Sequence, residues 1–160
     1  MHPITVRPAT PDDGPVLRSM AYELADHEGL PRPIAFTDES ARAMLAGPTP
    51  QMRALIAEAN EEALGSVTYT YLYWPWHGQE VIYVDDLIVR ETARGRGVGR
   101  ALMHEVARIA LAEGRRVRWE VTPDNRAARA FYQRLGASMT EKTICLWDEG
   151  AMREELARRG

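Results

Sequence analysis

Arg94-Gly95-Arg96-Gly97-Val98-Gly99 is the junction between a strand-like run and a helix-like run. Residues 81–89, just before it, are apolar and rich in β-branched side chains, which is typical of a buried strand. After it, apolar residues recur at three- and four-residue spacing up to Ala110, which predicts a helix that ends at Gly114. Glycines allow a ligand to approach the backbone closely, and the first turn of a helix carries unpaired N–H groups. The junction therefore predicts an anion site suited to a pyrophosphate.

The residue pattern of this junction differs from the patterns of two other phosphate-binding loops. The Lys-Ser/Thr ending of a P-loop is missing, and Arg100 stands where a dinucleotide-binding G-x-G-x-x-G motif has its last glycine. Arg94, Arg96 and Arg100 surround the turn, and arginine forms charge-assisted hydrogen bonds with phosphate. A flexible helix cap without a ligand is the alternative interpretation of the glycines.

The rest of the chain alternates between strand and helix periodicity. Strands are predicted at residues 4–7, 53–58, 64–74, 117–121 and 143–147. Further helices are predicted to begin at Thr10, Thr37 and Asn125, with a terminal helix over residues 148–159. Neither a linker nor a repeat interrupts this order, which predicts a single domain over residues 1–160. Antiparallel strands followed by a β-α-β crossover predict an α/β fold with a mixed sheet covered by helices.

Composition and charge limit the class of protein. The chain of 160 residues is 45% hydrophobic and 27% charged, which is a globular composition and excludes intrinsic disorder. The net charge of -3 argues against nucleic acid as the main partner. Cys145 is the only cysteine, so neither an internal disulfide nor a cysteine-based metal site is expected. The sequence lacks a signal-peptide pattern and an apolar stretch of about 18 residues, so we expect a cytoplasmic protein that binds no membrane.

The junction and its neighbours resemble a known family. Arg94-x-x-Gly97-x-Gly99 resembles the acetyl-CoA-binding loop of the GNAT-type acetyltransferase superfamily. Residues 83–89 resemble that family's fourth strand, and Asn125-x-x-Ala128-x-x-Phe131-Tyr132-x-x-Leu135-Gly136 resembles its second cofactor-contacting helix. Val84-Asp85-Asp86-Leu87 and Trp119-x-Val121 resemble the branch of polyamine and diamine N-acetyltransferases. The resemblance implies a GNAT-type fold, in which a mostly antiparallel sheet splays between its fourth and fifth strands.

The resemblance also implies an activity. The expected reaction is acetyl-CoA-dependent N-acetylation of a small primary amine, such as a diamine, a polyamine or an amino-acid-like amine, with no metal. The amine would attack directly in a ternary complex, and the family commonly forms homodimers. Acetylation of a protein or peptide amine and a non-catalytic module that binds coenzyme A are the alternatives.

Cofactor-binding residues follow from the same resemblance. The main chain of Leu87, Ile88 and Val89 is implied to hold the pantetheine arm in place of a missing strand. The pyrophosphate is assigned to the loop and first helical turn, which comprise Arg94, Gly95, Arg96, Gly97, Val98, Gly99 and Arg100. Asn125 and Arg134 are further candidates for contacts with coenzyme A, with a helix cap and a surface charge as their alternatives.

Two residues are candidates for proton transfer. The resemblance assigns Tyr132 to protonate the coenzyme A sulfur, and a core aromatic residue is the alternative. It places Asp85 at the acceptor site, where the carboxylate could accept the ammonium proton through a water molecule. Neighbours on a strand point to opposite faces, so Asp85 and Asp86 can share a face only if a bulge intervenes. A structural role for both carboxylates is the alternative.

The acceptor pocket is predicted from its chemistry, because aromatic faces and carboxylates together suit a cationic amine. The candidates besides Asp85 are Asp86, Glu28, Tyr71, Trp119 and Glu120. For the aromatic residues, packing in the core is the alternative to a role in the acceptor pocket.

Overall fold

A computed structural model describes residues 3–29 and 35–158. The chain divides into two compact units, Met1–Thr122 and Pro123–Gly160. The first unit contains, in chain order, β1 (Thr5–Pro8), η1 (Pro11–Asp13), α1 (Gly14–Glu28), α2 (Asp38–Leu45), β2 (Arg53–Ala59), β3 (Glu62–Trp74), η2 (Pro75–His77), β4 (Gln79–Val89), η3 (Glu91–Ala93), α3 (Val98–Ala112) and β5 (Val117–Arg118). The second unit contains α4 (Arg126–Arg134) and α5 (Glu149–Ala157).

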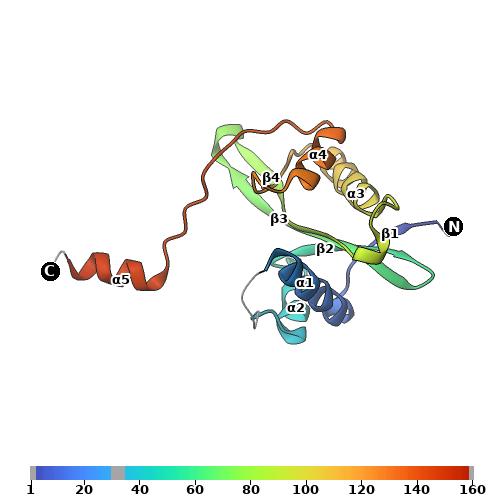
Figure 1. Ribbon diagram of the computed structural model, residues 1–160, viewed down its shortest axis with the longest axis horizontal. Coiled ribbons are helices and arrows are strands. Elements are labelled where there is room, and N and C mark those ends of the chain that lie inside the picture. Colours follow the sequence, from blue (N-terminus) through green and yellow to red (C-terminus); the bar gives the residue numbers. More distant parts are fainter. Residues whose placement is uncertain (1–2, 30–34, 159–160) are drawn as a thin grey trace. The chain divides into compact units, whose positions relative to one another are not determined.

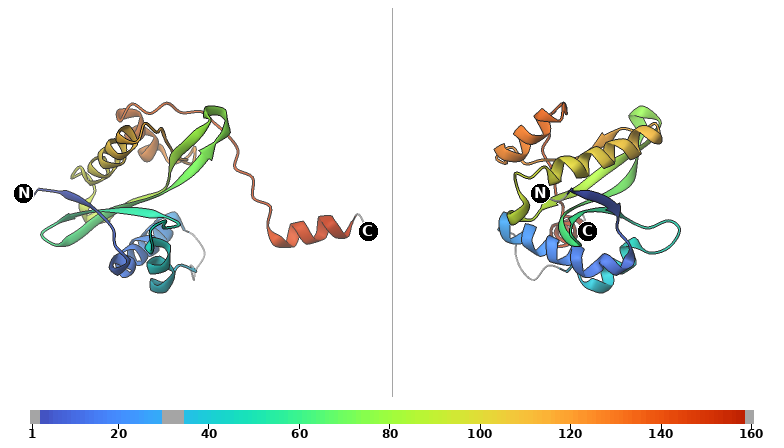
Figure 2. Two further views of the ribbon diagram at one scale, coloured as in Figure 1. Left: turned by 180° about the vertical axis from the view of Figure 1, so that it is seen from behind. Right: turned by 90° about the vertical axis from the view of Figure 1, so that its right-hand side faces the viewer.

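The strands of the first unit form one sheet in the order β1-β2-β3-β4-β5. Pairing is antiparallel from β1 to β4, and β5 runs parallel to β4 after the crossover through α3. Helices α1 and α2 lie on one face of the sheet and α3 lies on the other (Figures 1 and 2). The predicted mixed sheet with flanking helices is therefore confirmed.

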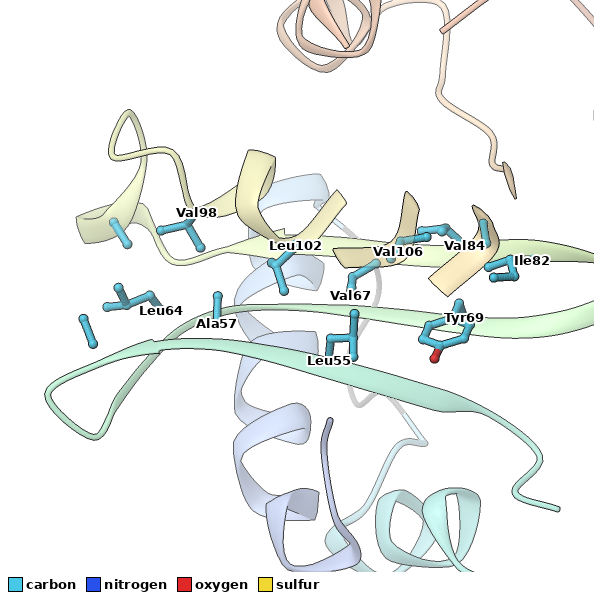
Figure 3. Close-up of a cluster of buried hydrophobic side chains, with 13 residues drawn as sticks. Leu55, Ala57, Leu64, Val67, Tyr69, Ile82, Val84, Val98, Leu102 and Val106 are labelled. Atoms are coloured by element: carbon cyan, nitrogen blue, oxygen red, sulfur yellow. The ribbon is translucent and has the colours of Figure 1, made fainter. Parts of the chain in front are cut away.

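The core lies between the sheet and α3. Leu102 and Val106 of α3 lie over Val67 of β3 (Figure 3), and all three side chains are at most 1% exposed. A second cluster on the opposite face joins Leu17 of α1 to Ile56 of β2. The sheet is thus buried on both faces, which explains why its central strands consist of apolar runs.

The sheet splays between β4 and β5, as predicted. These two strands pair only at Ile82↔Val117 and Tyr83↔Arg118, and they separate beyond that point. The predicted strand at 117–121 therefore ends early, at Arg118, because a strand needs a neighbour for its backbone hydrogen bonds. Beyond that point, no strand among the described residues pairs with the β5-facing edge of β4.

One predicted element is wrong. Residues 143–147 form no strand, although their apolar, β-branched composition is typical of one. Ile144 is 67% exposed and Leu146 is 93% exposed. Composition reports only the preference of the side chains, whereas a strand also needs a pairing partner, and the described part of the second unit contains no strand. The terminal helix predicted after it is present as α5, capped by Asp148, whose Oδ1 accepts a hydrogen bond from the Ala151 N–H at 3.0 Å.

Candidate active site

The glycine-rich junction is an exposed loop held between two buried anchors. Ala93 and Val98 are 0% and 1% exposed, and the residues between them are exposed. Gly95 has φ 75° and Gly97 has φ 86°, a left-handed conformation that favours glycine. A Cβ atom added to either glycine would meet no atom within 4 Å among the described residues. The backbone of the loop is therefore open to a ligand.

Helix α3 begins directly at this loop. Gly97 is the N-cap residue and offers no side chain to the N–H groups of the first turn. Those N–H groups have no partner within the helix, and the helix dipole adds partial positive charge there. Arg94, Arg96 and Arg100 all expose their side chains around the turn. An open backbone, a helix N-terminus and three guanidinium groups fit a pyrophosphate.

Gly65 of β3 seats the start of α3 against the sheet, a role that the sequence interpretation missed. A Cβ atom there would come within 2.6 Å of the Ile88 carbonyl oxygen and 3.0 Å of Val98 Cγ1. Only glycine allows this close approach of helix, β3 and β4. A glycine inside a strand that is rich in β-branched residues was the available signal.

The open edge of β4 leads into the loop. Leu87, Ile88 and Val89 pair with β3 on one side, whereas no described residue pairs with them on the β5 side. The Ile88 side chain is 7% exposed, and Leu87 and Val89 pack against the core, so a ligand at this edge would meet main-chain groups, of which the Val89 carbonyl accepts a hydrogen bond from Arg94 Nε at 3.4 Å. An extended ligand can add to such an edge as a strand does.

A β-bulge lies in β4 at the two aspartates. Val67 pairs with Leu87 and Tyr69 pairs with Val84, so two residues of β4, Asp85 and Asp86, lie opposite Thr68 alone. Val84 and Leu87 nevertheless both contact the core beneath α3. The two carboxylates between them therefore belong to the other face of the sheet, and both residues are exposed. The bulge is the condition under which Asp85 and Asp86 can share a face.

The surroundings of Asp85 alter its acidity and that of a neighbouring tyrosine. Desolvation raises the pKa of the Asp85 carboxyl above its ordinary value, which makes its carboxylate a stronger base. Burial, followed by the negative charges of Glu120 and Asp85, raises the pKa of Tyr83. Glu120 also pairs with Arg118 at 3.3 Å. Glu120 thus lies in the same electrostatic neighbourhood as Asp85.

Tyr71 and Trp119 lie elsewhere. Both pack against the core beneath α3, on the opposite face of the sheet from the bulge. The Tyr71 hydroxyl donates a hydrogen bond to Glu113 Oε1 at 2.9 Å, and the guanidinium of Arg53 lies 4.5 Å from the centre of its ring. Burial, together with the hydrogen bond to Glu113, raises the pKa of Tyr71 to about 12. Glu28 is the last residue of α1, and its side chain lies outside the described residues.

The remaining predicted residues belong to the second unit. Tyr132 of α4 is 9% exposed, and burial raises the pKa of its phenol, so the hydroxyl keeps its proton at neutral pH. Asn125 caps α4, because its Oδ1 accepts a hydrogen bond from the Ala128 N–H at 3.0 Å. Arg134 lies exposed in the last turn of this helix.

Residues 3–29 and 35–158 contain neither a candidate membrane-spanning helix nor a candidate metal cluster. None of the helices found there has the length and apolarity needed to cross a membrane. The same residues contain no cluster of three or more His, Cys, Asp or Glu side chains arranged to hold a metal ion.

The sequence and the fold were compared with those of known proteins. A profile of the acetyltransferase (GNAT) family matches residues 20–137. The thialysine N-epsilon-acetyltransferase of Bos taurus is 32% identical over 158 residues, which cover 91% of this chain and 92% of that protein. The mouse (Mus musculus) protein of the same name is 33% identical, with 92% and 93% covered. A possible acetyltransferase from Clostridium difficile 630 has the same fold, with a TM-score of 0.78 over 91% of this chain and 97% of that one at 19% identity.

The family profile spans most of the chain, from α1 to the end of α4, and the relatives align over nearly all of it. The resemblance first seen in the glycine-rich junction thus extends over most of the sequence and to the fold. The chain belongs to the acetyltransferase (GNAT) family.

Proposed function

We propose that this protein transfers the acetyl group of acetyl-CoA to a primary amine of a small, amino-acid-like molecule. The main support for this proposal is the β4 bulge, which presents two neighbouring carboxylates, Asp85 and Asp86, to a cation. The bulge comes directly after the point where β4 and β5 stop pairing. Acetyl-CoA supplies the acetyl group as a thioester when it is bound. Direct attack by the amine in a ternary complex needs no nucleophile from the protein.

The loop and the first turn of α3 bind the coenzyme in this proposal. The N–H groups around Gly97 and Gly99 bind the pyrophosphate, and the nearby arginines add charge-assisted hydrogen bonds. The main chain of Leu87 to Val89 holds the pantetheine arm along the open edge of β4. Open space above Gly95 and Gly97 supports this assignment, because any side chain there would take up the room that the ligand needs.

Asp85 accepts the proton of the substrate ammonium, directly or through water. A primary amine is mostly protonated at neutral pH and cannot attack until it loses that proton. The raised pKa of Asp85 supports this role, because a stronger base removes the proton more readily. Asp86 and Glu120 add negative charge near the cation.

Tyr132 gives its proton to the sulfur of the departing thiolate. A thiol has an ordinary pKa of about 8.5, so its thiolate leaves more readily when a proton donor is at hand. A phenol with the ordinary pKa of about 10 is already protonated at neutral pH, so Tyr132 carries the proton that the thiolate takes up.

The class of amine comes from the relatives. The bovine and mouse enzymes are named for acetylation of the ε-nitrogen of thialysine. An L-2,4-diaminobutyric acid acetyltransferase of Halalkalibacterium halodurans is 33% identical over 82 residues, which cover 51% of this chain. We therefore place side-chain amines of amino acids ahead of polyamines and aminoglycosides as substrates.

A thiol-release assay with acetyl-CoA tests this function against a panel of amines. The panel contains thialysine, lysine, 2,4-diaminobutyrate, spermidine, an aminoglycoside and a lysine-containing peptide. We expect the highest kcat/KM with an amino acid that carries a side-chain amine. Turnover of the peptide alone would instead support a protein acetyltransferase. Tight binding of acetyl-CoA with no thiol release from any amine would support a binding module.

We also propose that the whole chain acts as one domain, and as a homodimer in the cytoplasm. The family profile crosses the boundary between the two units, which supports a single functional domain. Ile144, Leu146 and Trp147 are large apolar residues that are at least 60% exposed. Exposed apolar side chains in such a group are typical of an interaction surface.

A further inference from the structure

The β4 bulge is tied to one side chain of the neighbouring strand. Thr68 is the only residue of β3 opposite Asp85 and Asp86, and its Oγ1 accepts a hydrogen bond from the Asp86 N–H at 3.2 Å. A bulge interrupts the backbone ladder, so the N–H groups of the extra residue need partners outside the regular pattern. The threonine hydroxyl provides an acceptor at this place.

The backbone that carries the Thr68 hydroxyl is anchored on both sides. Its neighbours Val67 and Tyr69 are 0% and 5% exposed and belong to the core beneath α3. Thr68 itself is half-buried, and a β-branched side chain in a strand has restricted χ1 freedom. A hydroxyl on such a segment can fix a backbone group of the next strand without moving itself.

The core requires the bulge but does not fix its shape. Val84 and Leu87 lie three residues apart and both contact this core, whereas regular pairing would turn one of them to the opposite face. The extra residue therefore stays in β4 whatever residue 68 is. The conformation of Asp85 and Asp86 between these two anchors is set locally, and the Thr68 hydroxyl of β3 holds the Asp86 N–H there.

We propose that Thr68 is a positioning residue for the amine end of the active site. Its hydroxyl fixes the conformation of the bulge and thereby the direction in which Asp85 presents its carboxylate. Thr68 acts through Asp85 and touches no reacting atom. This inference rests on the proposed function, because it assumes that Asp85 accepts the proton of the substrate.

Three substitutions at matched positions test the role of the hydroxyl. Thr68→Val keeps the shape of the side chain and removes the hydroxyl, so we expect kcat/KM for the amine to fall about tenfold, the size of effect that the loss of one hydrogen bond produces. The melting temperature and the affinity for coenzyme A should stay near those of the wild type. Thr68→Ser keeps a hydroxyl and should restore most of the activity. Thr70→Val changes the same face where pairing with Tyr83 is regular, and it should behave as the wild type.

A double-mutant cycle with Asp85→Asn separates positioning from a merely structural role. If Thr68 acts through Asp85, Thr68→Val should cost little further activity once Asp85 is already replaced. An undiminished loss in the Asp85→Asn background would overturn the inference, as would equal losses in Thr68→Ser and Thr68→Val. A damaging Asp85→Asn with a fully active Thr68→Val would overturn the role of Thr68 alone. A silent Asp85→Asn would instead overturn the role of Asp85 in the proposed function, and that of Thr68 with it.

Discussion

Tyr132 and Asp85 handle protons in opposite directions in the proposed reaction. Burial raises the pKa of both side chains above the ordinary value. The Tyr132 phenol is protonated at neutral pH with or without the shift, and that is the form that a proton donor needs. For Asp85 the shift favours the acid, so the carboxylate that remains is a stronger base.

Tyr132→Phe should lower kcat by about 100-fold, within the usual contribution of a general acid, and leave the affinity for acetyl-CoA unchanged. The ring stays in place and only the proton is lost. Steady-state kinetics and a calorimetric titration measure the two effects separately. Tyr73→Phe, which changes a 59% exposed tyrosine in β3, is the control. A Tyr132→Phe variant with the turnover of the wild type would remove Tyr132 from the reaction.

The pH dependence of kcat/KM should report Asp85 on its acidic limb. Activity should rise with pH as the carboxyl loses its proton, and because its pKa is raised, this rise should lie above the ordinary range of an aspartate near pH 3.9. Asp85→Asn should abolish this limb, whereas Asp86→Asn should retain it. An acidic limb that persists in Asp85→Asn would assign it to another group.

At the scale of elements, the junction between β4 and α3 combines an open loop with a helix N-terminus. Gly97→Val should abolish binding of coenzyme A, because a branched side chain would fill the space over the backbone that the ligand needs. Gly78→Val is a matched control: Gly78 also has positive φ and open surroundings, but it lies in the turn between β3 and β4. Both variants carry similar backbone strain. Normal binding of coenzyme A to Gly97→Val would contradict the assignment of the loop.

A second junction, between β1 and α1, should make stability depend on pH. Arg7 donates hydrogen bonds to both carboxylate oxygens of Asp13, at 2.8 and 2.9 Å. This pairing, which outweighs the opposing effect of burial, lowers the pKa of Asp13 to about 2. A lowered pKa stabilises the folded protein above the ordinary pKa of an aspartate, and the gain disappears as pH falls through the folded value.

Wild type and Asp13→Asn should therefore differ in free energy of unfolding by about 2 kcal/mol at neutral pH. The difference should shrink as pH falls from about 4 toward 2. Urea denaturation at a series of pH values measures it. A difference that stays constant over this range would mean that the Asp13 carboxylate is not the stabilising group.

Local signals predicted most of the elements. Thr37 caps α2 as expected, with its Oγ1 accepting a hydrogen bond from the Ser40 N–H at 3.1 Å. The junction and α3 were also predicted, because glycine spacing and helical periodicity are both local. The sequence alone indicated that Asp85 and Asp86 would need a bulge to share a face, but it did not predict the bulge. A bulge depends on the register between β3 and β4, which are paired strands. The close approach at Gly65 likewise involves three elements that are far apart in the chain.

At the scale of the whole molecule, residues 143–147 show where a sequence pattern is insufficient. Their composition predicts a strand, yet a strand is a relation between two segments, and no described segment pairs with this one. The family could be predicted, because it depends on a few motifs. Quaternary structure could not, because it depends on surfaces that the sequence does not identify.

The exposed apolar residues of this tail lead to a prediction on assembly. Leu146→Glu should shift the protein from dimer to monomer in light scattering, because a charge at a buried interface is costly. Leu111→Glu changes an 80% exposed leucine of α3 and should leave the mass unchanged. A wild-type protein that is monomeric at all concentrations, or a dimeric Leu146→Glu variant, would contradict the proposed interface.

Identification of the product tests the central claim most directly. Wild-type protein is incubated with acetyl-CoA labelled in its acetyl group and with thialysine, and both products are quantified by mass spectrometry and thiol titration. We predict one labelled acetyl group on the side-chain nitrogen for each coenzyme A thiol released. Thiol release that leaves the amine unlabelled, or saturated binding of acetyl-CoA with no product, would contradict acetyl transfer to a small amine.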